Sequence, residues 1–206
     1  MEKPVTDKPF SPACERNRGP ILQILREVLS DCRCVLEIGS GTGQHAVYFG
    51  AQLPYLVWQT SDVAENHAGI QAWLKEAKLP NVRQPLLLDV AASTWPEENF
   101  DAIFSANTCH IMSWLEVEAM FEGIGRVLEE GGILCIYGPF NYHGAFTSES
   151  NARFDAALRA SVPHRGIRDA EAVDALAMKH GMQLEADHEM PANNRLRVWR
   201  RQGRGG

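Results

Sequence analysis

The stretch CVLEIGSGTGQHAVYF, residues 34–49, decides how the rest of the sequence is interpreted. Its opening run is short and mainly apolar, which predicts a buried strand. Gly39, Gly41 and Gly43 follow, before an apolar segment that is compatible with a helix. Glycine permits a sharp turn and lets a bound molecule approach the backbone, and the first N–H groups of a helix point into such a turn. We therefore predict a ligand-binding turn between a strand and a helix.

Glu37 lies just before the first glycine and separates two classes of ligand. The dinucleotide fingerprint G-x-G-x-x-G places its third glycine one residue later, where this chain has Gln44. A carboxylate at position 37 would also repel a pyrophosphate held in the turn. The pattern favours a cationic ligand, such as S-adenosylmethionine (SAM), which carries both an ammonium and a sulfonium group.

Two further acidic residues follow predicted strands. Asp62 ends the second strand, where a carboxylate can accept both ribose hydroxyls of NAD or of SAM. Asp89 ends the third strand and can accept from an adenine amino group, with Val90 offering a backbone N–H and an apolar contact. Taken singly, Glu37 is explained as a cap or an arginine partner, and the two aspartates as helix caps. Their recurrence at three strand ends, together with the glycines, favours an adenosyl ligand.

Strand-like and helix-like segments alternate along the chain. Strands are predicted at residues 35–38, 55–62, 82–90, 100–107, 133–140, 183–189 and 195–200. Helices are predicted after Pro20, at 44–52, around 70–77, from the capping box of Ser113 and Glu116 to Gly131 and Gly132, near 149–161 and near 170–180. Pro85 indicates an edge strand or a late start of the strand. The alternation predicts an α/β fold: a Rossmann-like, seven-stranded, mainly parallel sheet with helices on both faces and a C-terminal antiparallel hairpin.

The composition fits one globular domain. The chain has 206 residues, of which 45% are hydrophobic, and we expect a single domain over 1–206, with an extended arm at 1–16 and a disordered tail at 202–206. A net charge of −6 argues against a nucleic-acid partner. The basic residues near the end fit a solvated strand face and a loose tail; they are Arg195, Arg197, Arg200, Arg201 and Arg204.

Cysteine and histidine spacing excludes two kinds of site. The five cysteines show neither paired zinc spacing nor a disulfide framework, and the seven histidines form no two-ligand spacing, so we predict reduced thiols and no metal. The N-terminus has no apolar core of a secretory signal, and no run reaches 18 apolar residues. These features predict a cytoplasmic protein without a membrane partner.

The sequence resembles the class I SAM-dependent methyltransferases. The matching motifs, in order, are VLEIGSGTG (35–43), QTSD (59–62), LLLDV (86–90) and FDAIFSANTCHIM (100–112). More narrowly, it is similar to a small family that includes the vertebrate methyltransferase-like protein 26. This match covers almost the whole chain and rests on SPACERNRGPIL (11–22), WQTSD, NTCHIMSW (107–114), YGPFNYHGAFTSESNARFD (137–155) and GIRD (166–169). The narrower resemblance implies no established substrate.

The resemblance implies where the cofactor lies. It places Glu37 near the SAM amino group, Asp62 on the ribose, and Asp89 with Val90 at the adenine. The remaining assignments are the turn residues Gly39, Ser40, Gly41 and Gly43, and Asn107 on the methionine side. Arg16 or Asn17, in the segment CERNRG, are predicted to fold over the cofactor, with Arg16 pairing the SAM carboxylate; the alternative is a solvated helix start.

The loops after the fourth and fifth strands are expected to hold the methyl acceptor. His110 is the candidate general base, and its alternative role is to order its loop. The candidate lining residues are Asn141, Tyr142 and His143, while Tyr137 and Phe140 either pack over the cofactor or belong to the core. Arg153 and Arg168 either hold an anionic substrate or pair with Asp155 and Asp169. Cys109 fits core or pocket lining better than a nucleophile.

These features predict a SAM-dependent methyltransferase with a small-molecule acceptor and S-adenosylhomocysteine as product. The alternative is a SAM-binding protein without transferase activity, acting as a sensor or partner subunit. A nicotinamide oxidoreductase is disfavoured, because no tyrosine has a lysine three or four residues later. The sequence leaves the acceptor atom and the oligomeric state open.

Overall fold

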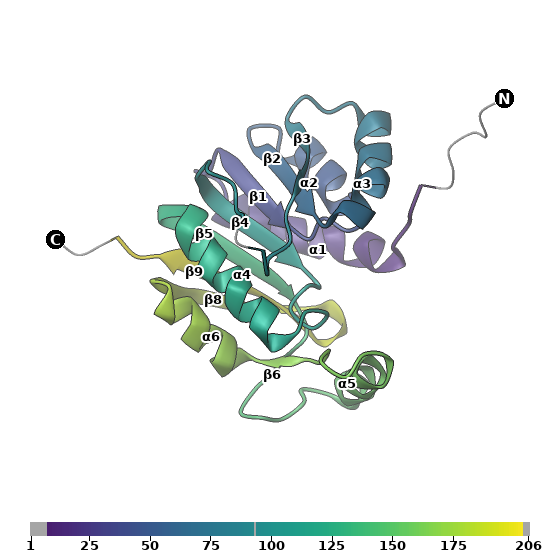
Figure 1. The fold of residues 1–206 in the computed structure, drawn as a ribbon, viewed down its shortest axis with the longest axis vertical. Helices are drawn as coiled ribbons and strands as arrows, with labels where there is room; N and C mark the ends of the chain where they lie inside the picture. Colours follow the sequence, from purple (N-terminus) through teal and green to yellow (C-terminus); the bar gives the residue numbers. More distant parts are fainter. Residues whose placement is uncertain (1–7, 93, 204–206) are drawn as a thin grey trace.

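The computed structural model describes residues 8–92 and 94–203 (Figure 1). Its main sheet has seven strands in the order β3-β2-β1-β4-β5-β9-β8. The strands are β1 (Cys34–Ile38), β2 (Val57–Asp62), β3 (Val82–Leu87), β4 (Phe100–Ala106), β5 (Leu128–Gly138), β8 (Met182–Met190) and β9 (Asn194–Arg201). The helices are α1 (Pro12–Val28), α2 (Gln44–Gln52), α3 (Ala64–Ala77), α4 (Trp114–Val127), α5 (Glu149–Ser161) and α6 (Ala170–Lys179).

The predicted α/β architecture is confirmed. The strands from β3 to β5 pair in parallel, whereas β9 pairs antiparallel with both β5 and β8. One apolar core packs α1, α2 and α3 against one face of the sheet, and a second packs α4 and α6 against the other (Figure 1). The strand order reverses beside β1, which lies between β2 and β4. A crevice at the carboxyl ends of these strands is the expected ligand site of such a sheet.

The prediction for the start of the first helix was wrong. The helix begins at Pro12, so residues 12–16 of the predicted arm are helical, and Pro20 lies inside α1. Ser11 caps the helix by accepting a hydrogen bond from the N–H of Cys14 at 3.4 Å, and proline is tolerated in the first turn. Residues 8–11 of the arm form neither helix nor strand, and its residues 1–7, like residues 204–206 of the tail, lie outside the described residues.

Two strand boundaries differ from the prediction by three residues or more. β3 ends at Leu87, because its last partner is Asp62 at the end of β2; the predicted edge position of this strand is confirmed. β5 begins at Leu128, so Gly131 lies within an irregular strand start and does not end α4. The capping box of α4 is as predicted: Ser113 Oγ accepts from the N–H of Glu116 at 3.3 Å, and the N–H of Ser113 donates to that carboxylate at 2.5 Å.

A second, two-stranded sheet was not predicted. It joins β6 (Phe140–Asn141) in parallel to β7 (Arg168–Asp169). The short helix η1 (Pro191–Asn193) connects β8 to β9, and the Asn151 side chain on α5 donates to the carbonyl of Asn193 at 3.1 Å. These contacts bring the chain after β5, the segment before α6 and the last hairpin together.

Three further findings concern features that the sequence analysis considered. All five cysteines are free. Across residues 8–92 and 94–203, no helix is both long and apolar enough to cross a membrane. The same part of the chain contains no group of three or more His, Cys, Asp or Glu side chains arranged to hold a metal ion.

Candidate cofactor and acceptor site

The glycine turn joins β1 to α2 at the carboxyl edge of the sheet. Gly39, Gly41 and Gly43 have φ angles of 73°, 57° and 89°, in the left-handed region that glycine adopts at least cost. The N–H groups of Gly39 and Ser40 donate to the carbonyl of Ser61 at 3.1 and 2.9 Å. The turn is therefore fixed to the end of β2.

The three glycines have different surroundings. A Cβ on Gly39 would lie 2.6 Å from Cγ2 of Thr108, and one on Gly43 would lie 3.0 Å from the Cα of Ile70. A Cβ on Gly41 would meet nothing within 4 Å. Gly39 and Gly43 are therefore required by close packing, whereas Gly41 opens onto free space next to the backbone.

Glu37 is a buried carboxylate directly below this turn. Its side chain accepts hydrogen bonds from Ser40 Oγ at 2.8 Å and from Trp58 Nε1 at 3.2 Å. Burial raises the pKa of Glu37 to about 7, and the nearby charge of Asp62 adds to the rise. An ionised carboxylate in this position is stabilised by a cation. Trp58 was not predicted as part of the site, although the motif WQTSD includes it.

Asp62 ends β2 and is only 7% exposed. Its Oδ2 accepts from the N–H of Gly41 at 2.7 Å, and its Oδ1 accepts from the N–H of Val63 and from Asn66 Nδ2, both at 2.8 Å. A carboxylate has about four acceptor positions, so about one is left for a ligand hydroxyl. The carboxylate thus holds the backbone of Gly41 in place beside any ligand it binds.

Asp89 and Val90 lie beyond the end of β3. Asp89 is exposed, and its Oδ1 accepts from the N–H of Ala91 at 3.0 Å. Val90 is 6% exposed and packs in a core cluster with Leu36 and Ile38. Asp89 is therefore exposed to solvent, whereas the Val90 side chain belongs mainly to the core.

Gln44, which the sequence analysis noted only for its place in the fingerprint, fixes the start of α1. The side chain is 1% exposed. Its Oε1 accepts from the N–H of Ser11 at 2.5 Å and from Thr42 Oγ1 at 3.0 Å, while its Nε2 donates to Glu15 at 3.1 Å. These bonds hold the first turn of α1 against the glycine turn, as the predicted fold-over of the N-terminal segment requires.

Of the two residues predicted to fold over the cofactor, Asn17 is buried and Arg16 is exposed. Asn17 Oδ1 lies 2.7 Å from His45 Nε2. Burial raises the pKa of the Tyr137 hydroxyl, and Asn17, Arg16 and Asn194 are close enough to lower it in part. Arg16 is therefore close enough to Tyr137 on β5 for its charge to act on the hydroxyl.

The side chains of Asn107 and His110 both lie near Gly138, the last residue of β5. Asn107 has a φ of 60°, and its N–H donates to the carbonyl of Tyr137 at 2.8 Å. A Cβ on Gly138 would lie 3.7 Å from His110 Nδ1 and 3.9 Å from Asn107 Oδ1. The imidazole and the amide therefore share one space above Gly138.

His110 is 5% exposed, and its ring makes an edge contact with Phe154 at 5.3 Å. Burial, together with the positive charges of Arg168 and Arg165, lowers the pKa of His110 to about 4. The imidazole is therefore neutral at pH 7 and able to accept a hydrogen bond, whereas its surroundings disfavour protonation. The neighbouring Cys109 thiol has its pKa raised to about 11 by burial, which disfavours a nucleophilic thiolate.

The predicted acceptor-lining residues have different surroundings. Asn141 is 7% exposed, and its Oδ1 has no hydrogen-bond partner within the described chain. Tyr142 donates to Asp187 at 2.6 Å, and burial with this partner raises its pKa. His143 is exposed and lies 3.3 Å from Glu171.

The two candidate arginines are engaged within the protein. Arg153 is exposed and lies 3.5 Å from Glu149, one turn away. Arg168 donates to the backbone carbonyls of Cys109 at 3.0 Å, of His164 at 2.9 Å and of Met112. Arg168 was expected to hold an anionic substrate or to pair with an aspartate, but its partners in the structure are backbone carbonyls.

The two aromatic candidates, Tyr137 and Phe140, lie in different core clusters. Tyr137 lies at the carboxyl end of β5 next to Asn17. Phe140 is 1% exposed and packs in the core beneath α4 and α6, with the Arg197 guanidinium 5.4 Å from its ring centre. Both rings therefore belong to the core, Phe140 on one face of the sheet and Tyr137, which is 3% exposed, on the other.

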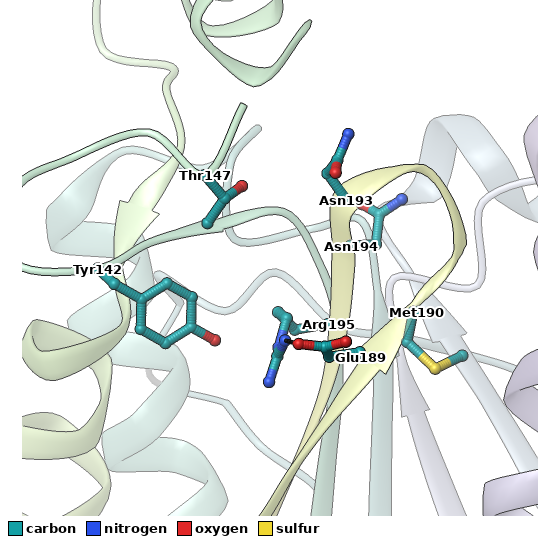
Figure 2. Close-up of a pocket in the computed structure, with 7 residues that line it drawn as sticks. All are labelled: Tyr142, Thr147, Glu189, Met190, Asn193, Asn194 and Arg195. Carbon is teal, nitrogen blue, oxygen red and sulfur yellow. Dashed lines mark ion pairs between the residues drawn. The ribbon is translucent and has the colours of Figure 1, made fainter. Parts of the chain in front are cut away.

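A pocket of about 420 Å³ lies between the loop after β6 and the last hairpin. Figure 2 shows the residues that line it: Tyr142, Thr147, Glu189, Met190, Asn193, Asn194 and Arg195. The one cation among them, Arg195, is 2.7 Å from Asp187 and 3.2 Å from Glu189. The lining therefore offers amide and hydroxyl groups and an aromatic face, with its positive charge already compensated.

Comparison with known proteins places the chain among proteins of related fold. A family model described as "Protein of unknown function (DUF938)" matches residues 8–201. An O-methyltransferase family protein from Burkholderia thailandensis has a TM-score of 0.81 at 15% identity, over 93% of this chain and 58% of that one. The mitomycin 7-O-methyltransferase MmcR also has a TM-score of 0.81, at 17% identity, over 92% of this chain and 54% of that one.

A third structure, PigF with S-adenosylhomocysteine (SAH), has a TM-score of 0.76 at 16% identity, over 90% of this chain and 56% of its own. The chain therefore spans a little over half the length of these structures. The likeness shows that this chain shares the fold of these structures.

Proposed function

Because the chain belongs to the DUF938 family and has the fold of methyltransferases, we propose that it is a SAM-dependent methyltransferase with a small-molecule acceptor. One observation carries the proposal: the buried carboxylates of Glu37 and Asp62 accept hydrogen bonds from Ser40 and Gly41 of the glycine turn, where Gly41 opens onto free space. The finer resemblance to the methyltransferase-like protein 26 family and a cytoplasmic location are parts of this proposal.

The residues present fit SAM better than a dinucleotide. Two carboxylates at one turn attract a cation and repel a pyrophosphate. Glu37 would take the ammonium end of the cofactor, and Asp62 would accept from a ribose hydroxyl. Gly39, Ser40, Gly41, Gly43 and Asn107 would border the methionine part, Asp89 and Val90 the adenine, and Arg16 with Asn17 the carboxylate side.

SAM supplies an activated methyl group on a sulfonium, so the protein mainly has to align the acceptor and exclude water. His110 is neutral at pH 7 and would hold an acceptor hydroxyl by accepting its hydrogen bond, a role that fits its low pKa better than general base catalysis does. Asn141 would orient the acceptor through its unpartnered Oδ1. The pocket beside Tyr142 and Asn194 would hold the body of the acceptor, and its compensated charge suits a neutral molecule.

The direct test is isothermal calorimetry of the purified protein with SAM, SAH and NAD. We expect both adenosyl compounds to bind at micromolar levels and NAD to show no heat of binding. Binding of SAM without transfer to any of a panel of phenols, amines and thiols would favour the sensor alternative. Binding of NAD alone would overturn the proposal.

The affinity for SAM should depend on pH through Glu37. Its raised pKa, about 7, means that a proton has to leave before the carboxylate can pair with a cation. The apparent association constant is therefore expected to fall about tenfold for each pH unit below 7. Calorimetry between pH 5.5 and 7.5 measures this slope, and the Glu37→Gln variant should show none. His45 and His110 both have pKa values lowered to about 4, so neither titrates in this range.

A further inference from the structure

Two residues of the motif GIRD (166–169) form hydrogen bonds to the backbone of the loop that carries His110, residues 107–112. The guanidinium of Arg168 donates to the carbonyls of Cys109 and Met112, on both sides of His110. The N–H of Gly166 donates to the carbonyl of His110 itself at 3.0 Å. Three hydrogen bonds from one short segment therefore hold the backbone that carries the imidazole.

The segment that makes these bonds is itself fixed from two directions. Arg168 lies on β7, which pairs with β6 directly after β5. The carboxylate of Asp155 on α5, 5% exposed, accepts from the N–H of Ile167 at 2.7 Å and from Arg159 at 2.7 Å. A Cβ at Gly166 would lie 2.8 Å from Asp155 Oδ1, so the chain passes closely over this ion pair.

We propose that Arg168 is a positioning residue, which holds the loop at 107–112 so that the His110 imidazole faces the acceptor side of the site. Its Nε and Nη2 donors are directed at backbone carbonyls, so its contacts are explained without an anionic substrate. The functional meaning of this role rests on the proposed methyltransferase activity, but the contact itself can be tested without cofactor or acceptor.

Arg168 also acts on the charge of the imidazole. Of the groups around the ring, Phe154 on α5 is apolar, and Asn107 and Gly138 are uncharged. The charges that act on it within the described residues are those of Arg168 and Arg165. Both disfavour the imidazolium form, but only Arg168 bonds to the carbonyls beside His110.

This difference gives a matched pair of variants, Arg168→Gln and Arg165→Gln. Each variant removes one positive charge near His110, so each is expected to raise the pKa of the His110 imidazole. NMR titration of the imidazole Cε1 proton measures this pKa, and the His110→Asn variant assigns the resonance. Only Arg168→Gln should also speed amide exchange at Ile111 and Met112, by about tenfold or more. These amides donate to the carbonyl of Thr108 in the folded loop.

Arg168→Lys completes the test, because it keeps the charge and loses the fork of donors. We expect it to leave the pKa of His110 low while still speeding exchange at Ile111 and Met112, and it decides the question if Arg168→Gln does not fold. Unchanged exchange in Arg168→Lys, or equal exchange in the two glutamine variants, would overturn the positioning role. Calorimetry with SAM is a separate measurement, so a failure of the proposed function can be told apart from a failure of this inference.

Discussion

Replacement of Glu37 by glutamine is expected to weaken SAM binding by about 100-fold. The carboxylate is 2% exposed and lies below the open backbone of Gly41. A hydrogen bond to a charged group contributes about 1.5–3 kcal/mol, and the upper end of this range corresponds to about 100-fold in affinity. Calorimetry at pH 7.5, where most of the wild-type carboxylate is ionised, measures the difference.

The same substitution should leave the fold intact. Glutamine has nearly the shape of glutamate, and its carbonyl oxygen can still accept from Ser40 Oγ and Trp58 Nε1, the partners of Glu37. The free energy of unfolding at pH 8 is expected to be unchanged or higher, because no buried charge has to be kept ionised. Glu27→Gln is the matched control, on an exposed part of α1. Equal affinities for SAM in the Glu37→Gln and wild-type proteins would remove Glu37 from the site.

The fold was predictable because the local signals agree with the tertiary arrangement. The apolar run before Gly39, the capping box at Ser113 and the turn within the last hairpin each indicate the element that forms. The start of α1 was missed although Ser11 and Pro12 are a local cap and a first-turn proline. The hydrogen bond from the N–H of Ser11 to Gln44, distant in sequence, also holds this start, and no local pattern encodes that bond.

The candidate site was predictable in its position more than in its contacts. The glycines and the acidic residues lie at strand ends, and parallel strands bring their carboxyl ends to one edge. The partners of these residues come from other elements: Trp58 donates to Glu37, and Asp62 accepts from Gly41. The role of Arg168 was not predictable, because it depends on the short β6–β7 pairing.

The glycines of the turn allow stability and ligand binding to be separated. Gly43→Ala is expected to destabilise the protein by about 2–4 kcal/mol, since alanine is strained in the left-handed region and its Cβ would press on the backbone of Ile70. For a chain of this size that corresponds to a fall in Tm of roughly 5–15 °C. Differential scanning calorimetry without ligand measures it.

Gly41→Ala should show the opposite pattern, because its Cβ meets no protein atom and would occupy the space next to the backbone. We expect a stability loss of only about 1–2 kcal/mol from the backbone, but a fall in SAM affinity of about 10- to 100-fold from crowding of the ligand. Gly181→Ala, after α6, is the matched control: it has a φ of 77° and equally open surroundings. If Gly41→Ala and Gly181→Ala bind SAM equally well, the free space at Gly41 is not the cofactor site.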